Sequence, residues 1–402
     1  MRLPRLPLLA LALLCACPSD DDGGDGNADE TGTGGDATAP LSVVSYNVGL
    51  AFGYVPEASG RKDAVIAALA SSDADVVCVQ ELWTNQNDAG EWTTEVIDEV
   101  LAATSTNFPN QYWQRTVTSD TTTPLGCTVE EAEPLEACAM ANCGSEPPEN
   151  LASCVTTLCE AEFLGTSPGC QSCMASNLGG TLDDIIMACK GVFSSGVVYD
   201  GHNGLAILSK HPLTTTEILE LDYALTARAV LHATVAPEGA EPVDLYCTHL
   251  ASDLSSTIDY PPNGTYTSFA EENAAQAMAA LGWIDQTATA PTTILAGDMN
   301  HGPQVGTGHA ELADNYQIVL GAGFTDPIAD SGASCSFCEA NTLQSGSGTD
   351  GELIDHVYLR GTADVQSATI VYDDAVPIVT TDGSTQNLHR SDHYGVRIDL
   401  LH

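Results

Sequence analysis

The sequence has very few basic residues. Its 402 residues include 11 lysines and arginines against 55 aspartates and glutamates, which gives a formal net charge of −44. Such a charge repels polyanions and therefore argues against tight, non-specific binding along nucleic-acid phosphates. It does not exclude a phosphate-containing substrate, because a divalent metal ion can supply the missing positive charge.

Long apolar runs are also lacking. The segment from Leu8 to Leu14 follows Arg2 and Arg5 and is typical of the core of an export signal. It is too short to cross a bilayer, and no later segment approaches the roughly 20 apolar residues of a membrane span. Any attachment to a membrane would therefore use a lipid.

The end of this signal, Leu14-Cys15-Ala16-Cys17, resembles the bacterial lipobox, in which a small residue precedes a cysteine that receives lipid. We expect residues 1–17 to be a signal peptide with Cys17 as the lipidation site; a plain secretory signal is the alternative. Residues 18–40 are acidic and lack apolar periodicity, which predicts a disordered linker. The expected location is the cell envelope, lipid-anchored at the outer membrane or cell surface, or the medium.

Cysteine, in contrast, is abundant, and eight of the 14 cysteines lie between residues 126 and 190. Many of them recur every 16 residues, which predicts an inserted array of short helices and turns held by disulfides. The pairing cannot be deduced from the spacing. A zinc site at Cys170 and Cys173 is the alternative, but an exported protein favours disulfides. Cys335 and Cys338 favour a local disulfide, and Cys78 and Cys247 are expected as buried thiols or one cross-strand pair.

Outside this insert, short β-like runs alternate with loops and a few helices. This pattern predicts an α/β or α+β layered fold with two packed sheets, built from residues 41–125 and 191–402. The expected strands are 41–49, 74–82, 204–210, 229–235, 243–250, 292–300, 353–359 and 395–401, and the expected helices are 61–69 and 268–283.

Polar residues stand at or near the ends of several of these strands. Because strand ends of packed sheets meet at one rim, the side chains are expected to converge on one cleft. The set contains carboxylates for a hard cation and for accepting a proton, two imidazoles and several amides, which suits phosphate-ester hydrolysis. Its members are Asn47, Gln80, Glu81, His249, Asp298, Asn300, Asp355, Asp392 and His393.

The order of these residues, including Gly297-Asp298-Met299-Asn300 and Ser391-Asp392-His393, resembles the endonuclease/exonuclease/phosphatase superfamily. The resemblance spans about residues 41–402, interrupted by the insert. It implies a four-layer α/β sandwich of two packed mixed sheets, with the site at one rim.

The resemblance also implies roles for the residues. Glu81 would be the main Mg²⁺ ligand (or Mn²⁺), with Asn47 orienting the metal shell and Asp392 beside it. Asp298 would position or deprotonate the attacking water, and Asn300 would hold the water or the phosphate. Asp355 would orient His393 at the phosphate, where His249 would also lie. Arg228 and Asn203 would contact substrate, a surface ion pair being the alternative for Arg228.

The expected activity is metal-dependent hydrolysis of phosphate esters by a monomer. A phosphodiesterase acting on phospholipid headgroups, similar to sphingomyelinase C, agrees with export and a lipid anchor. An extracellular deoxyribonuclease is the first alternative, although residues 41–125 and 191–402 hold 38 acids and 8 bases. A non-catalytic surface binding protein is the second, and the intact catalytic set argues against it.

Overall fold

The structure is a computed structural model that describes residues 40–402 except 87–90, 117–124, 192–196 and 345–350. The predicted signal peptide, Cys17 and residues 18–39 of the predicted linker lie outside the described residues.

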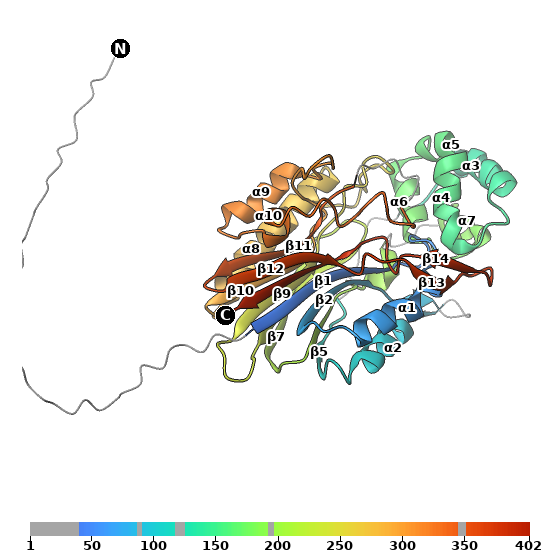
Figure 1. The fold of residues 1–402 in the computed structure, drawn as a ribbon. Helices are drawn as coiled ribbons and strands as arrows, with labels where there is room; N and C mark the ends of the chain where they lie inside the picture. The colour runs from blue at the N-terminus through green and yellow to red at the C-terminus, as the bar shows by residue number, and fades with distance from the viewer. Residues whose placement is uncertain (1–39, 87–90, 117–124, 192–196, 345–350) are drawn as a thin grey trace, which may run out of the picture. The chain divides into compact units, whose positions relative to one another are not determined.

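Two mixed sheets form the centre of the protein (Figure 1). The first has the strand order β12–β15–β1–β2–β6–β5, in which only β1 and β2 are parallel among the described strands. Its strands are β1 (Pro40–Leu50), β2 (Val76–Leu82), β5 (Asn110–Tyr112), β6 (Ala206–Ser209), β12 (Asp364–Val371) and β15 (Gly395–Leu401).

The second sheet has the order β11–β10–β9–β8–β7, with β9 and β10 parallel and the other pairs antiparallel. Its strands are β7 (Leu213–Leu221), β8 (Arg228–Val235), β9 (Val243–His249), β10 (Thr292–Asp298) and β11 (Asp355–Gly361). Two small hairpins lie outside both sheets: β3 (Asn85–Gln86) with β4 (Trp92–Thr93), and β13 (Val376–Val379) with β14 (Thr385–Leu388).

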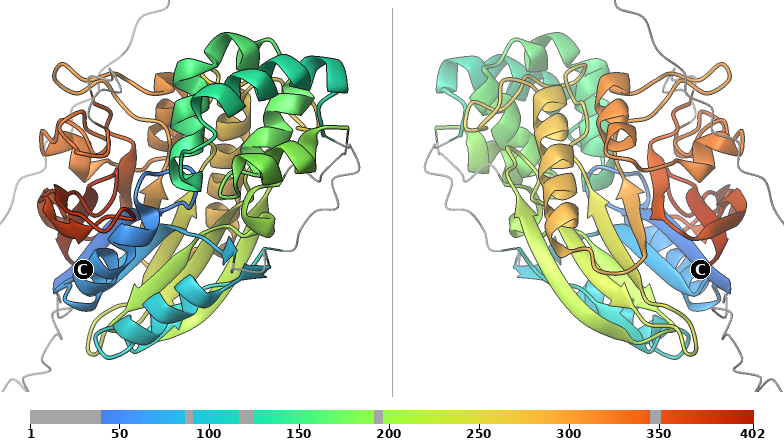
Figure 2. Two further views of the ribbon diagram at one scale, coloured as in Figure 1. Left: turned by 90° about the vertical axis from the view of Figure 1, so that its right-hand side faces the viewer. Right: turned by 90° about the vertical axis from the view of Figure 1, so that its left-hand side faces the viewer.

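The sheets pack face to face, and helices cover their outer faces (Figure 2). Apolar side chains of both sheets, such as Ile207 and Leu231, form the core between them. Helices α1 (Ala58–Ala70) and α2 (Glu95–Thr104) share a second core with the first sheet, and α8 (Phe269–Thr287) and α9 (Ala313–Gly321) share a third with the second sheet. The short α10 (Pro327–Asp330) adds Ile328 to the central core. These layers confirm the predicted four-layer α/β sandwich.

Helix α8 begins where its sequence signals place it. The side chain of Ser268 accepts a hydrogen bond from the backbone N–H of Glu271, and Glu271 and Glu272 favour the positive end of the helix dipole. The predicted helix is confirmed, and it continues to Thr287.

A disulfide between Cys78 of β2 and Cys247 of β9 joins the two sheets through the core. It confirms the cross-strand pair among the two alternatives for these residues. The local Cys335–Cys338 disulfide is also confirmed.

The cysteine-rich insert folds into five helices gathered in one cluster (Figure 1). They are α3 (Val129–Asn142), α4 (Pro148–Leu158), α5 (Glu160–Leu164), α6 (Pro168–Ser176) and α7 (Leu182–Cys189). The disulfides are Cys127–Cys170, Cys138–Cys159, Cys143–Cys154 and Cys173–Cys189. Both cysteines of the alternative zinc site are therefore oxidised, which removes the thiolates that zinc would need.

The two ends of the insert lie together. The backbone N–H of Cys127 donates to the carbonyl of Cys189 (2.9 Å), and Gly191 donates back to Cys127 (2.9 Å). The insert therefore leaves and re-enters the sandwich at one place.

Within the described part of the chain, no helix is both long enough and apolar enough to cross a membrane.

Candidate active site

The predicted site residues meet at one rim of the two sheets. In the second sheet, Asp298 at the end of β10 pairs in register with His249 at the end of β9 and with Asp355 at the start of the antiparallel β11. In the first sheet, Asn47 of β1 pairs with Gln80 of β2. Strand register therefore brings together three motifs in the second sheet and two in the first.

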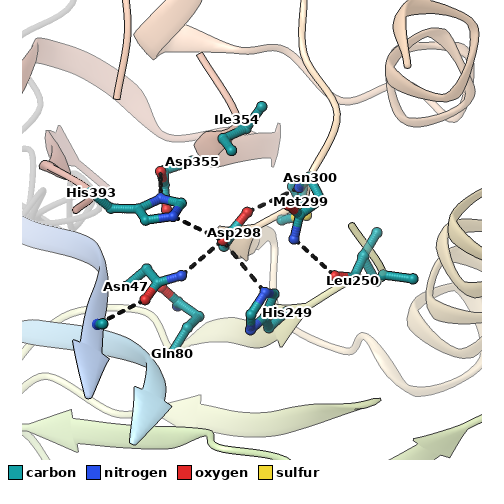
Figure 3. Close-up of polar contacts among 12 residues, drawn as sticks. Asn47, Gln80, His249, Leu250, Asp298, Met299, Asn300, Ile354, Asp355 and His393 are labelled. Carbon is teal, nitrogen blue, oxygen red and sulfur yellow. Dashed lines mark hydrogen bonds and ion pairs between the residues drawn. The ribbon is translucent and has the colours of Figure 1, made fainter. Parts of the chain in front are cut away.

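Asp298 lies at the centre of the cluster (Figure 3). Its Oδ2 accepts a hydrogen bond from Asn47 Nδ2 (2.9 Å) and lies 3.4 Å from His249 Nε2 and 3.8 Å from His393 Nε2. Its Oδ1 accepts from the backbone N–H of Asn300 (3.0 Å). Burial, with the nearby carboxylate of Asp355, raises the pKa of Asp298 to about 6. The carboxyl is thus held in position and can accept a proton more readily than an exposed aspartate.

The two histidines of the cluster differ in charge. His393 Nδ1 lies 2.8 Å from Asp355 Oδ2. Burial lowers the pKa of His393, but the carboxylates of Asp355 and Asp298 outweigh it and raise the pKa well above its usual value. Burial and the positive Arg228 instead lower the pKa of His249 well below its usual value. The cluster therefore pairs a cationic imidazole with a neutral one.

Glu81 is the penultimate residue of β2 and has a left-handed backbone (φ 58°), which turns its side chain away from the strand pattern. Its Oε2 is buried and has no hydrogen-bond partner in the described structure. Burial, followed by the nearby Asp392 carboxylate, raises the pKa of Glu81 to about 7. A carboxylate oxygen without a donor, close to further carboxylates, is the environment that a divalent cation would stabilise.

The donor set fits a hard metal ion. Ligand atoms of Glu81, His249 and Asp298 lie within 4.8 Å of one another. Asp392 packs tightly against the last residues of β1, because a Cβ on Gly49 would lie 2.5 Å from Asp392 Oδ1. Gly49 also has a positive φ of 56°, so this position requires glycine on two grounds. Glu81 and Asp298 are the oxygen-bearing members of this cluster. The other two predicted ligand residues lie beside it: Asn47 donates to Asp298, and the Asp392 carboxylate is close enough to raise the pKa of Glu81.

Arg228 is a buried cation at the start of β8, with only 5% of its surface exposed. Its Nε and Nη1 lack hydrogen-bond partners in the described structure, and its guanidinium carbon lies 6.0 Å from the centre of the Trp83 ring. Glu81 and Asp298 lie close enough to affect its pKa, although burial is the larger effect and lowers it. The guanidinium therefore has donors left for an anion.

Two predicted residues make mainly structural contacts. Asn203 donates to the carbonyl of Gln114 (2.7 Å) and accepts from the N–H of Leu205 (3.0 Å), so both ends of its amide bind backbone. This differs from the expectation that its side chain faces substrate. Asn300 donates to the carbonyl of Leu250 (3.0 Å). That bond ties the loop after β10 to the end of β9.

Two residues near the site were given no role by the sequence. Trp83 follows the Gln80-Glu81 motif, stacks on Tyr199 with ring centres 4.7 Å apart, and lies beside Arg228. Ser391, the first residue of the Ser391-Asp392-His393 motif, donates to the carbonyl of Asn47 (2.8 Å), which joins the last motif to the first. The position of Trp83 next to a motif, and of Ser391 within one, is the signal that could have indicated a role.

The chain belongs to the endonuclease/exonuclease/phosphatase family, whose model matches residues 44–393. This is a family of phosphoester hydrolases, and the match includes every candidate active-site residue and all strands of the two sheets except β15 and the start of β1. No curated protein matches the chain by sequence.

Solved structures share the fold at low sequence identity. Sphingomyelinase C from Streptomyces griseocarneus is 17% identical with a TM-score of 0.53, over 90% of this chain and 99% of that chain. A beta toxin mutant from Staphylococcus aureus with bound magnesium ions is 13% identical with a TM-score of 0.50, over 90% and 99%. A family protein from Beutenbergia cavernae is 16% identical with a TM-score of 0.50, over 90% and 71%.

Proposed function

We propose that the protein is a Mg²⁺-dependent phosphodiesterase that hydrolyses headgroup esters of phospholipids, as a sphingomyelinase C does. One observation carries the choice of substrate: a single basic side chain of the described structure, Arg228, has neither an acidic nor a carbonyl partner, and it lies in the candidate active site. A site with one such cation suits one phosphate group. A nuclease must also bind the phosphates on either side of the scissile one.

The remaining basic side chains are already engaged. Arg61 donates to backbone carbonyls of Pro56, Arg390 and Gly49. The others form ion pairs with acidic residues: Lys62 with Glu99, Arg115 with Asp200, Lys190 with Glu136, Lys210 with Asp75, Arg360 with Asp285, Arg390 with Asp374, and Arg397 with Asp73 and Asp399. Arg228 alone, among the nine bases of the described residues, has no such acidic or carbonyl partner. In the part of the chain that the structure describes, the basic side chains therefore form no free row along which a nucleic-acid strand could bind.

The metal would be held by Glu81, with Asn47 and Asp392 beside it. When bound, it would neutralise charge on the phosphoryl oxygens. Asn47 also holds Asp298 in place through the 2.9 Å hydrogen bond, so one amide would link the metal side of the site to the proton acceptor.

The other residues would handle protons and charge. Asp298 would accept a proton from the attacking water, since burial raises its pKa to about 6. His393, kept cationic by Asp355, would donate to a phosphate oxygen, and Arg228 would bind another. The neutral His249 would orient the phosphate. Asn300 would hold the loop after Asp298 and would also donate a hydrogen bond to the attacking water. Asn203 would then shape the site through the backbone and not through substrate contact.

Removal of the metal should abolish activity. We expect phosphodiester hydrolysis to fall to background after treatment with excess EDTA and to return with Mg²⁺ or Mn²⁺, because Glu81 and Asp392 would otherwise repel the phosphate. Turnover of a metal-stripped sample, followed by release of p-nitrophenol from bis-p-nitrophenyl phosphate, measures this. Undiminished turnover in EDTA would contradict the proposed metal dependence.

Substrate preference tests the proposed function directly. With Mg²⁺, we expect kcat/KM for sphingomyelin or phosphatidylcholine to exceed that for plasmid DNA, RNA and inositol phosphates by at least roughly 10²-fold, a typical value of well-matched transition-state contacts. Release of phosphocholine and nicking of the plasmid are the two readouts. Preferential cleavage of DNA would identify a nuclease instead, and no cleavage of any ester would indicate a binding protein.

A further inference from the structure

An apolar cavity lies between the cysteine-rich insert and the catalytic sandwich. Its volume is about 190 Å³, larger than the about 150 Å³ apolar cavity that can hold a benzene ring. Small side chains of the insert, Ala132, Ala139 and Ala152, leave this space open opposite Leu225 and Ile258 of the sandwich. Since protein interiors are normally close-packed, a space of this size lowers stability unless something fills it.

The lining has almost no polar atoms to hold water. The charged residues at the cavity, Glu136 and Lys190, form an ion pair with each other. An apolar cavity of this kind stays dry and takes apolar ligands. The apolar lining of the cavity therefore favours a hydrocarbon ligand.

A smaller hollow beside the candidate active site adjoins the cavity. Leu225 and Leu254 line both the cavity and a smaller hollow whose wall includes Arg228. Leu225 and Trp83 belong to one cluster of buried apolar side chains, and Trp83 lies close to Arg228. The side chains that lie between a phosphate at Arg228 and the insert cavity, Leu225 and Leu254, are thus apolar.

We propose that this cavity binds an alkyl chain of the lipid whose phosphate is hydrolysed at Arg228, so that the insert is a substrate-recognition module. The inference rests on the proposed function. The proposal assigns a binding site to the alkyl chain, which is the part of the substrate that the catalytic residues do not contact.

The surface of the insert suits a lipid with no net charge. Five of the eight large apolar side chains that are most exposed in the described structure lie on it: Val129, Met140, Leu158, Leu164 and Met187. The insert also holds ten acidic residues and one basic residue. These features favour contact with zwitterionic lipid over an anionic bilayer, because like charges repel.

Binding of a fluorescent fatty acid tests the cavity without catalysis. We expect cis-parinaric acid to bind the wild-type protein in EDTA. Ala152→Phe places a ring in the cavity and should weaken binding at least tenfold. Thr157→Phe adds the same ring on the exposed side of helix α4 and should not change it. Thr156→Phe, also at the cavity, serves as a second variant if Ala152→Phe unfolds, which circular dichroism would reveal.

Chain length provides the second measurement. For short-chain phosphatidylcholines below their micelle concentration, we expect kcat/KM of the wild type to rise by up to about fourfold per methylene until the cavity is full. Ala152→Phe should flatten this dependence and leave the shortest substrate unaffected.

The outcomes separate the two proposals. Hydrolysis of phospholipid without chain-length dependence, or fatty-acid binding that Ala152→Phe does not weaken, would overturn the cavity proposal and leave the proposed function in place. Binding that Ala152→Phe abolishes, in a protein that cleaves no phospholipid, would support the alkyl-chain site and overturn the proposed function.

Discussion

Replacement of Asp298 by asparagine should lower kcat for the best substrate by roughly 10²-fold or more, which is typical of a positioned proton acceptor. Asparagine keeps the shape of the side chain and can still bond to Asn47, but it cannot accept a proton at neutral pH. The His249 and His393 rings, 3.4 and 3.8 Å from Asp298 Oδ2, would also lose their shared negative partner. Steady-state kinetics with saturating Mg²⁺ measure the change.

Asp244 offers a matched control for this substitution. Its carboxylate is also fully buried on the second sheet and accepts hydrogen bonds from the N–H groups of Thr289 and Ala290 and from the hydroxyl of Thr234. It lies five residues before His249 along β9, about 17 Å away. Asp244→Asn should therefore lower the melting temperature and leave kcat per folded molecule unchanged. If Asp298→Asn keeps more than a third of the wild-type kcat while folded, Asp298 is not the proton acceptor.

Much of the site was predictable because it stands where strands end. His249 and Asp298 each close a strongly apolar strand and Asn47 lies three residues before the end of another, and such runs are recognised without knowledge of the partners. Register then brings them together: Asp298 pairs with both His249 and Asp355. The sequence does not show that Asn47 reaches Asp298, 251 residues away, because that contact depends on how the two sheets face each other.

Elements at the edges of the fold were harder to predict. Strand β7 reads Leu-Thr-Thr-Thr-Glu at its start and is largely exposed, so it lacks an apolar alternation. Helix α2 did carry a signal, since Val96, Ile97 and Val100 share one buried face, but it was not among the predicted helices. The spacing of apolar residues predicts a strand or helix only where one face of that element is buried.

Pairing of the insert cysteines also depended on tertiary structure. The regular spacing of 16 suggested a repeat, yet only Cys173–Cys189 joins cysteines 16 apart, and the other three pairs of the insert span 43, 21 and 11 residues. A disulfide needs Cα atoms about 4.4–6.8 Å apart, which depends on how helices pack and not on their spacing along the chain. The cavity beneath the insert is likewise a product of packing.

Replacement of His393 by alanine should have an effect as large as that of Asp298→Asn, roughly 10²-fold or more in kcat. The imidazole is the cationic member of the histidine pair, because the Asp355 and Asp298 carboxylates raise its pKa against the effect of burial. Without it the buried Asp355 carboxylate loses the partner 2.8 Å away, so some loss of stability is also expected. Thermal unfolding measured beside kinetics separates the two effects.

Asp355→Asn separates the contribution of the positive charge of His393 from that of the position of its imidazole ring. The amide can still hydrogen-bond to His393 Nδ1 and hold the ring, but it removes the negative charge that keeps the imidazole protonated. We therefore expect a smaller loss of kcat than for His393→Ala, with activity shifted to lower pH because the pKa of His393 falls when the carboxylate is gone. The pH profile of kcat for wild type and Asp355→Asn, measured with Mg²⁺ at saturation, reports the shift. An unshifted profile with unchanged kcat for Asp355→Asn would show that Asp355 does not support the charge of His393. Near wild-type turnover of His393→Ala would show that this histidine is not a catalytic residue.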